Sequence, residues 1–546
     1  MRLFVTKLRQ TERILAVIRE IELENVRIFG ERAYSFSLPE LTVFCGTNSS
    51  GKSTILKSIL LLRQSIDGLH FAGPEVDLGD YSSFVSHRNP HRDVSVAITF
   101  DDKLEPGEYS LMLSAPKDKD DSKKVAKDKL QANIPCLVKV SFTLCPAPKP
   151  GPDQETLFGF ANETRGLSGI KHQGILKSIT YETIVNEKEL FPWKVRLARE
   201  LANEKGSYDY EILMPKRYFE KVGGTRLMKV EKANGEHFVK ANASIKGIMP
   251  NGIFAEKMET ADSAEEKRAP RLYLFPLPPY FDDVLANLRS SLRNTEYLGP
   301  FRTPAKRYYI TNFDAIPDLD PEGRFLPYIL RNMEERMVLN VRPGEKKQVS
   351  ETLSDALNGW LYYLRTGNPP IERTESEIKV STLKGAIVEF EIKSVSGIGN
   401  HALADSGFGY SQVIPILVRG LLASEGSTFI VEQPELHLNP ALHVRLANFF
   451  VSMVRAGKQM IIETHSEHIV NAIRVFAAED EEGKLASKCA IHYIDAEDDT
   501  ITVHDLFIEP DSTVPKWPFH FFGEAASLAG RMLRAQKHTR NRVRHK

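Results

Sequence analysis

The stretch Val43-Phe44-Cys45-Gly46-Thr47-Asn48-Ser49-Ser50-Gly51-Lys52-Ser53-Thr54 decides the fold of this chain. It begins as an apolar strand and continues as G-x-x-x-x-G-K-S, the complete pattern of a phosphate-binding loop. The glycines allow the backbone to wrap closely around a triphosphate, with N–H groups pointing inward. In that arrangement Lys52 reaches the β- and γ-phosphates and the Ser53 hydroxyl ligates Mg²⁺. The apolar run from Thr54 to Leu62 predicts a helix whose N-terminus faces the anion.

The same loop supplies most of the residues expected to hold the nucleotide. The alternative interpretation is a glycine-rich turn that matches the pattern by chance, but the strand before it and the helix after it favour the phosphate loop. The predicted nucleotide ligands in this segment are Gly46, Thr47, Asn48, Ser49, Ser50, Gly51, Lys52, Ser53 and Thr54.

Length and composition limit what the chain does. Its 546 residues exceed what one compact core accommodates, so we expect more than one structural unit. Lysine plus arginine and aspartate plus glutamate both number 72, so no overall field draws the protein to nucleic acid or membrane. The widely spaced Cys45, Cys136, Cys145 and Cys489 are expected to be free thiols in a reducing compartment. No run approaches the ~20 apolar residues of a spanning helix, which favours a cytoplasmic protein.

Periodicity divides the chain into segments of different character. Alternation over 18–29 and the apolar run 36–45 predict strands, and the pattern then becomes helical up to about Gln64. Short alternating runs separated by Gly, Pro and Asn over 134–270 predict an inserted strand-rich subdomain. We expect an N-terminal lobe with the phosphate loop over 1–103, the insertion over 104–295, a helical segment over 296–375, a C-terminal lobe over 376–530 and a basic tail over 531–546.

Two polar residues follow apolar strands in the last part of the chain. The strand from Thr428 to Val431 ends in Glu432, and one strand later comes His465. In P-loop enzymes a carboxylate at this place helps to hold Mg²⁺. Polar side chains at the ends of parallel strands meet in the crevice where ligands bind. A lone histidine is more simply explained as a cap or a core residue, but its place one strand after Glu432 favours the site.

Four motifs together resemble those of an ABC-type ATPase domain of the SMC, RecF and OLD kind. They are the phosphate loop, the run Asp405-Ser406-Gly407-Phe408-Gly409-Tyr410-Ser411-Gln412, the run 432–440 and Thr464-His465-Ser466. The patterns E-Q-P-E-x-H-L-x-P and G-F-G-x-S-Q are similar to those of bacterial antiphage ATPases, especially the PtuA family of Septu systems and its retron-associated form. Leu298 to Arg302 and Trp517 to Phe522 also match, and the likeness covers roughly 18–103 and 296–530.

The resemblance implies the fold and the cofactors. The implied fold is α/β, a P-loop ABC-type ATPase whose mixed or parallel sheet with flanking helices is built from discontinuous N- and C-terminal segments, with the strand-rich subdomain inserted. The implied cofactors are ATP and Mg²⁺, with Ser53 and Glu432 as the metal ligands. Residues 405–412 would then be the signature loop, which contacts nucleotide held by a second copy in a head-to-head homodimer. Its expected contact residues are Gly407, Gly409, Ser411 and Gln412. The alternative for this run is an ordinary glycine-rich helix start.

One residue departs from the family pattern. The position after Glu432 is a glutamate in ABC ATPases, where it polarises the attacking water, and here it is Gln433. An amide orients water but cannot accept its proton, and general-base catalysis contributes ~10²–10⁴-fold, so we expect slow hydrolysis. Glu435 is the candidate substitute, unless it only caps the helix that begins near Pro440. The predicted catalytic residues are Glu432, Gln433, Glu435 and, at the γ-phosphate, His465.

The segment after these motifs bears on partners. It is too short for the TOPRIM nuclease unit that follows the ATPase in OLD nucleases. The resemblance to Septu systems implies a separate, PtuB-like HNH endonuclease, and the retron form implies a reverse transcriptase with its DNA–RNA product. The run from Arg531 to Lys546 has no acidic residue, so it is a candidate for nucleic acid contact, for solubility or for partner binding.

The prediction is therefore an ATP-hydrolysing sensor or motor subunit of an antiphage complex that dimerises on ATP and controls a nuclease. Two alternatives stay open. One is a RecF- or SMC-like repair ATPase that acts on DNA directly. The other is a non-hydrolysing scaffold that uses ATP only to hold a complex together, which Gln433 favours. Arg302 and Arg307 are candidates for lining a phosphate groove or for packing between lobes.

Overall fold

The structure is a computed structural model in which the chain divides into two compact units. The first comprises Met1–Leu38, Ser53–Glu296 and Ser424–Thr428, and the second comprises Pro39–Lys52, Tyr297–Ala423 and Phe429–Lys546. The residues that it describes are 17–104, 134–147, 174–185, 188–197, 210–215, 229–233, 236–257, 271–275, 279–310, 320–370, 376–383, 387–393, 399–405, 408–497, 500–509, 513–514, 528, 530–532 and 534.

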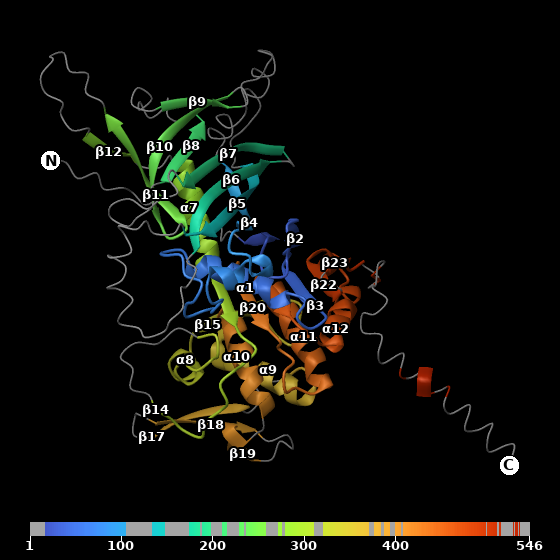
Figure 1. Ribbon diagram of the computed structural model, residues 1–546. Helices are drawn as coiled ribbons and strands as arrows, with labels where there is room; N and C mark the ends of the chain where they lie inside the picture. Colours follow the sequence, from blue (N-terminus) through green and yellow to red (C-terminus); the bar gives the residue numbers. More distant parts are fainter. Residues whose placement is uncertain are drawn as a thin grey trace, which may run out of the picture. The chain divides into compact units, whose positions relative to one another are not determined.

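An antiparallel sheet dominates the first unit. Its strands are β1 (Ile18–Glu24), β2 (Tyr34–Ser37), β4 (Val94–Leu104), β5 (Ile134–Pro146), β6 (Gly174–Val185), β7 (Lys188–Leu197), β8 (Tyr210–Pro215), β9 (Lys229–Ala233), β10 (Glu236–Lys246), β11 (Met249–Lys257) and β12 (Arg271–Phe275). Over the described residues this is an 11-stranded sheet in the order β12-β11-β10-β8-β7-β6-β5-β4-β1-β2, with β9 beside β10 (Figure 1). Strands are therefore present within 134–270, as the alternating runs predicted, but they belong to the same sheet as β1, β2 and β4.

The sheet runs across the expected boundary at residue 103. β4 pairs with β5 over its whole length, from Val94 opposite Leu144 to Leu104 opposite Ile134. β1 pairs with β4 on one side and with β2 on the other, so the N-terminal strands and the insertion share one ladder. Sequence periodicity marks each strand but carries no information on which distant strand becomes its neighbour.

Helix α7 (Pro279–Arg293) covers part of this sheet. Phe281, Val284, Leu285, Leu288 and Leu292 are buried, and this spacing makes one apolar stripe along the helix. The ring of Phe281 meets that of Tyr181 of β6 edge to face, with the ring centroids 4.8 Å apart. The first unit also holds α2 (Tyr81–Phe84), the 3-10 turn η1 (Ser86–Arg88) and α1 (Lys52–Gln64) from its second residue onward.

A mixed sheet of parallel and antiparallel strands forms the centre of the second unit. Its strands are β3 (Leu41–Gly46), β13 (Thr295–Leu298), β20 (Thr428–Glu432), β21 (Gln459–Glu463), β22 (Cys489–Glu497) and β23 (Thr500–Phe507). Over the described residues their order is β13-β20-β21-β3-β22-β23. Both neighbours of β3 run parallel to it, and β23 returns antiparallel to β22. Every residue of β20 and β21 is buried, as expected for strands covered on both faces.

Helices and two small sheets surround this centre. They are α8 (Leu326–Met333), α9 (Leu353–Thr366), α10 (Phe408–Leu422), α11 (Pro440–Arg455), α12 (Glu467–Ala478), α13 (Lys484–Ser487), the 3-10 turn η3 (Leu403–Asp405), the pair β15 (Met337–Val341) and β16 (Gln348–Thr352), and the sheet of β14 (Tyr309–Ile310), β18 (Ile387–Lys393), β17 (Ile378–Leu383) and β19 (Asn400–Ala402). Helix α11 contacts β3 and β21, and the fully buried Trp360 of α9 stacks edge to face on Phe449 of α11.

The expected helical segment 296–375 contains α8 and α9 but also strands. Residues 349–352, which fall inside this expected helical segment, belong to β16, because β16 pairs with β15 from Gln348 opposite Val341 to Thr352 opposite Met337. Helix α9 begins only after Thr352, whose hydroxyl accepts a hydrogen bond from the Asp355 N–H. The fold as a whole is α/β with a P-loop between β3 and α1, as predicted.

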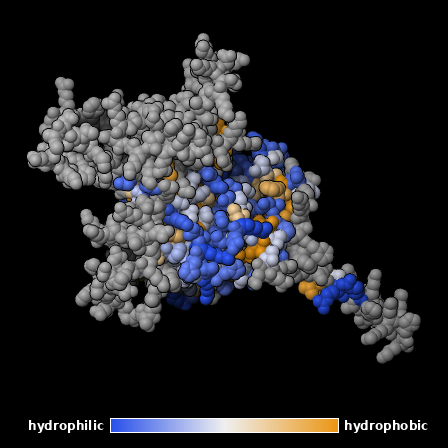
Figure 2. Space-filling view, turned by 45° about the horizontal axis from the view of Figure 1, so that its top comes forward, coloured by the Kyte–Doolittle hydropathy of each residue, from blue (hydrophilic) through white to orange (hydrophobic). Residues whose placement is uncertain are grey.

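The reduced cysteines and the hydropathy of the surface are typical of a globular protein. All four cysteines are free. Among the coloured residues of Figure 2, hydrophilic ones predominate, and apolar ones gather over a smaller area. Among the described residues, large exposed apolar side chains include Phe301, Met337 and Phe507. No helix in the described part of the chain is long and apolar enough to cross a membrane.

Candidate active site

The phosphate loop needs its glycines for different reasons. Gly46 has a φ of 137°, and a Cβ on it would lie 1.9 Å from the carbonyl oxygen of Ile494 in β22. Only glycine allows this close approach of two parallel strands. Ser49 and Gly51 also have positive φ, 60° and 94°, and turn the backbone into the start of α1. The loop is thus held against β22, where the Thr47 hydroxyl also donates to Asp495 at 3.2 Å.

Lys52, the first residue of α1, folds back onto the loop. Its Nζ donates to the carbonyl of Thr47 at 2.5 Å, to that of Gly46 at 3.3 Å and to the Ser50 hydroxyl at 3.3 Å. The side chain is 3% exposed, and burial lowers its pKa, while the negative charges of Glu463 and Glu435 act in the opposite direction. A lysine that satisfies itself on loop carbonyls is placed to exchange them for phosphate oxygens.

Glu432 ends β20 as a buried carboxylate. It is 2% exposed and accepts a hydrogen bond from the Tyr297 hydroxyl at 2.9 Å. Burial and the charge of Glu432 raise the pKa of Tyr297, so the phenol remains a neutral donor. The main-chain carbonyl of Glu432 accepts a hydrogen bond from Nη2 of Arg302 at 2.8 Å. Tyr297 therefore holds the side chain of Glu432, and Arg302, five residues later in the chain, holds its backbone.

Gln433 sits in a strained turn that is fixed from two sides. Its φ is 43°, a region that residues with a side chain rarely adopt. The peptide group between Glu432 and Gln433 has its carbonyl held by Arg302 and its N–H held by the carbonyl of Glu463 at 2.7 Å. The strain therefore persists because neighbouring strands and one buried arginine determine the peptide's orientation.

Glu435 is bound to the turn that carries His465. One carboxylate oxygen accepts from the Thr464 hydroxyl at 2.8 Å and the other from the His465 N–H at 2.7 Å. The alternative that Glu435 caps the next helix is wrong, because Asn439 is the N-cap of α11 and accepts from the Leu442 N–H at 3.0 Å. Glu435 therefore joins the loop after β20 to the loop after β21.

His465 is exposed at the end of β21. It is neither a core residue nor the cap of α12, because Ser466 is that cap and accepts from the Ile469 N–H at 3.2 Å. Burial of part of the ring and the charge of Lys52 lower its pKa, and Glu435 opposes this shift. The imidazole is therefore neutral at pH 7 and interacts electrostatically with both Lys52 and Glu435.

Sequence reasoning missed Glu463. It ends β21 as Glu432 ends β20, it is 2% exposed, and its charge acts on both Lys52 and Tyr297. The rule that selected Glu432, a polar side chain at the carboxyl end of an apolar strand, applies equally to this residue. Tyr297 left no comparable signal, because a tyrosine in a short strand is usually a packing residue.

The predicted site residues are brought together only in part. Gly409 begins α10 beside Leu438 and the His437 carbonyl, while Ser411 and Gln412 are buried in the helix. Gly407 lies outside the described residues, as do Trp517 to Phe522 and most of the basic tail. Ser53 and Thr54 follow Lys52 in α1 and belong to the first unit. The exposed Arg307 pairs with Asp405, the first residue of the signature run, at 2.7 Å.

The donor set suits magnesium rather than a metal that needs a dedicated cage. No group of three or more His, Cys, Asp or Glu side chains in the described part of the chain forms a metal cluster. Mg²⁺ usually takes one or two protein oxygens, phosphate oxygens and water. Two carboxylates, Glu432 and Glu463, end adjacent strands almost completely buried, which is the surplus of negative charge that a divalent cation balances.

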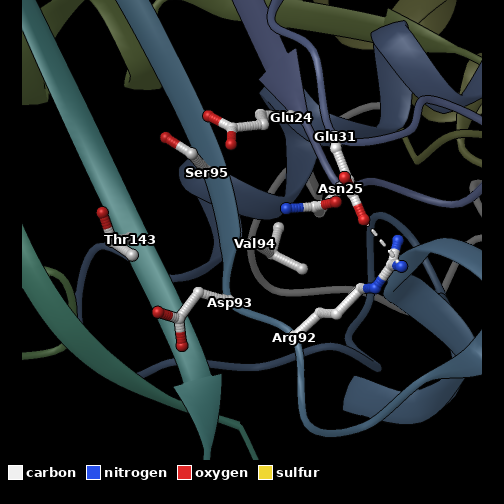
Figure 3. A pocket seen from close by; sticks show the side chains of 8 residues that line it. All are labelled: Glu24, Asn25, Glu31, Arg92, Asp93, Val94, Ser95 and Thr143. Carbon is white, nitrogen blue, oxygen red and sulfur yellow. Dashed lines mark ion pairs between the residues drawn. The ribbon is translucent and has the colours of Figure 1, made fainter.

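A separate pocket lies within the first unit and contains none of the predicted residues. Figure 3 shows its lining, from the end of β1 and the start of β4, with an ion pair of 2.7 Å between Arg92 and Glu31. Its volume is about 530 Å³, and its walls are largely polar and charged. The catalytic chemistry proposed below makes no use of it.

Comparisons with known proteins agree with a nucleotide site. Residues 311–470 match a family model described as an AAA ATPase domain. The match begins after the phosphate loop, which is assigned by its own geometry and pattern. No curated protein matches the chain.

Solved structures that resemble the chain include SMC head domains. One is an SMC head bound to the C-terminal winged-helix domain of ScpA, with 10% identity and a TM-score of 0.37 over 90% of this chain and 98% of that one. Another is the SMC head of Thermotoga maritima, with 10% identity and a TM-score of 0.33 over 89% and 98%. A third, described as derived from Pyrococcus furiosus, is an Smc head with an extended coiled coil bound to the C-terminal domain of ScpA, with 10% identity and a TM-score of 0.35 over 90% and 96%.

Proposed function

We propose that the second unit binds MgATP on the phosphate loop and hydrolyses it slowly. The observation that carries this proposal is the electrostatic convergence on Lys52. Glu463 from the end of β21, Glu435 from the loop after β20, and His465 all interact with this one ammonium group. Residues from three distant parts of the sequence therefore gather where a phosphate-binding lysine sits, which a fortuitous glycine turn does not explain.

Each residue has a distinct role in the proposed reaction. Lys52 leaves the carbonyls of its loop and binds the phosphates. Ser53 and Glu432 would hold Mg²⁺, which supplies a positive charge that offsets charge on the phosphates. Tyr297 keeps Glu432 oriented through its hydroxyl. The neutral imidazole of His465 is a hydrogen-bond partner for the terminal phosphate.

The attacking water is shared between Gln433 and Glu435. Gln433 is held rigidly and orients the water through its amide. Glu435 is the carboxylate of the two, and its oxygens already accept hydrogen bonds from the Thr464 hydroxyl and the His465 N–H. The proposed rate is low because Gln433 cannot accept a proton from the water and Glu435 is engaged by these two donors.

The resemblance of the motifs extends the proposal to partners. A head-to-head homodimer would place Gly407 and Gly409 at the nucleotide of the other copy, whereas Ser411 and Gln412 are buried in α10 and would support this turn from within. In this proposal, dimerisation on ATP controls a separate HNH endonuclease of an antiphage complex, with a reverse transcriptase in a retron context. Purification of the protein from its native operon tests the proposed partners, and recovery of the chain without a nuclease would contradict this part of the proposal.

Lys52→Ala tests the nucleotide site itself. It removes the phosphate ligand, so binding of MgATP should be lost, while Lys57→Ala, five residues later in α1, is the matched control and should bind normally. Isothermal titration of both variants measures this. Unchanged MgATP affinity in Lys52→Ala would sink the assignment.

The side chain of Gln433 is an amide, which cannot accept a proton from the attacking water. This favours a second candidate, a scaffold that binds ATP without turnover. Glu435→Gln separates the two. Under the hydrolytic proposal it lowers the rate by about 10²–10⁴-fold, the contribution of a general base, with binding retained. A wild-type protein that binds MgATP but releases no phosphate, and gains turnover with Gln433→Glu, supports the scaffold.

A further inference from the structure

Arg302 is a buried cation with unused hydrogen-bond donors. Its side chain is 5% exposed, and Nη2 is occupied by the Glu432 carbonyl. The other two nitrogens, Nε and Nη1, are buried without a hydrogen-bond partner. Buried polar groups in folded proteins are nearly always paired, so these donors require an explanation. An anion that enters the site during function is the chemistry that would satisfy them.

The surroundings of Arg302 are those of an anion site near the phosphate loop. Burial lowers its pKa to about 10, so the guanidinium is still charged at pH 7. Glu435 acts on this charge more strongly than Glu432 does, and Glu435 also acts on Lys52. The two cations therefore share one carboxylate, and a phosphate bound by Lys52 comes into the same electrostatic environment as Arg302.

We propose that Arg302 binds the terminal phosphate of ATP and couples it to the Gln433 turn. This inference rests on the proposed function, because it needs ATP on the phosphate loop. Nη1 and one N–H of Nη2 form a fork that donates to oxygens of the terminal phosphate, while the other N–H of Nη2 remains on the Glu432 carbonyl. That carbonyl belongs to the strained Glu432–Gln433 peptide group, so the terminal phosphate holds the residue that orients water. ADP lacks this phosphate and leaves Nη1 unpaired.

The consequence is discrimination between nucleotides. A residue that only packs, or only holds the Glu432 turn, affects ADP and ATP alike. A residue that binds the terminal phosphate affects only the triphosphate. Two charge-assisted hydrogen bonds to phosphate correspond to about 10- to 100-fold in affinity.

Arg302→Gln is the test, with Arg324→Gln as the matched control, because Arg324 is an exposed arginine that pairs with Asp320 and has no role in the proposed site. Affinities of Mg-ADP and of a non-hydrolysable ATP analogue are measured by titration for wild type and both variants. Arg302→Gln should lose about 10- to 100-fold in affinity for the analogue and none for ADP. Arg324→Gln should match wild type with both.

Arg302→Lys carries the same test if the glutamine variant does not fold. It keeps the charge, but the donors of an ammonium radiate from a single nitrogen and do not reproduce the planar fork of a guanidinium, so the same selective loss is expected. Equal weakening of both nucleotides, or no weakening, overturns the inference alone. Wild-type protein that binds neither nucleotide overturns the proposed function and this inference together.

Discussion

Replacing Lys458 by Met should change how the stability of the second unit depends on pH. Lys458 is 1% exposed, and its Nζ donates to the carbonyls of Leu339, Gly420 and Leu421 at 2.9, 2.8 and 2.9 Å. The last two carbonyls lie in the final turn of α10, which has no intrahelical partners for them. A buried lysine therefore caps the helix that begins at the signature run.

Two effects compete at this amine, and the pH dependence shows which prevails. Three carbonyls favour the charged form, and burial favours the neutral form. Burial lowers the pKa of Lys458 from the usual lysine value of 10.5 to about 7. Between these values the unfolded chain binds a proton that the folded chain has released, so the free energy of unfolding rises with pH. The slope is at most about 1.4 kcal/mol per pH unit, so the gain from pH 7 to pH 9 is about 2–3 kcal/mol.

Lys458→Met lacks this gain, because Met fills a similar volume without titrating. The assay is urea unfolding at pH 7 and pH 9, followed by the fluorescence of the fully buried Trp360 with Trp193 and Trp517 replaced by Phe. The difference between parent and variant should grow by about 2–3 kcal/mol over this range. The exposed Lys347→Met is the control and should parallel the parent. Equal slopes for Lys458→Met and its parent would show that the carbonyls keep the ammonium charged and would refute the reasoning.

Three further substitutions test single contacts, each by urea unfolding. Gly46→Ala places a Cβ 1.9 Å from a carbonyl oxygen of β22 and should cost more than about 3 kcal/mol; a wild-type midpoint would contradict the strand approach. Glu377→Gln removes one partner of the bidentate pair with Arg365, whose two hydrogen bonds measure 2.7 and 2.8 Å and whose side chains are 1% (Glu377) and 10% (Arg365) exposed. The free energy of unfolding should fall by about 3–5 kcal/mol. A fall smaller than that for an exposed surface ion pair would contradict this expectation. Tyr297→Phe removes the donor to Glu432 and should cost about 1.5–3 kcal/mol, and no change would mean that the hydrogen bond is not stabilising.

Local sequence patterns predicted the features that depend only on residues close together in the chain. The phosphate loop is recognisable because Gly46, Gly51 and Lys52 act through spacing alone, and α1 follows from the apolar run after them. The alternation of β20, α11, β21 and α12 was also predictable, because buried parallel strands read as apolar runs between amphipathic helices. For the same reason Glu432 and His465 were found at strand ends.

Contacts between distant segments were not predictable in this way. Glu435 binds Thr464 and His465, and only the folded chain shows that it does not cap α11. The clamp on the Glu432 peptide depends on Arg302, which arrives from a segment 130 residues away and has no spacing relation to it. The same holds for the pairing of β4 with β5, since strand propensity is silent about partners.

The central claim is that the loop from Gly46 to Ser53 holds a triphosphate beside Glu432, Glu435 and His465. An experimental structure with Mg²⁺ and a non-hydrolysable ATP analogue tests it most directly. The expected result is the triphosphate on this loop, with Lys52 moved from the carbonyls of Gly46 and Thr47 to phosphate oxygens. A nucleotide bound elsewhere, or Lys52 still on those carbonyls with the nucleotide present, would contradict the account.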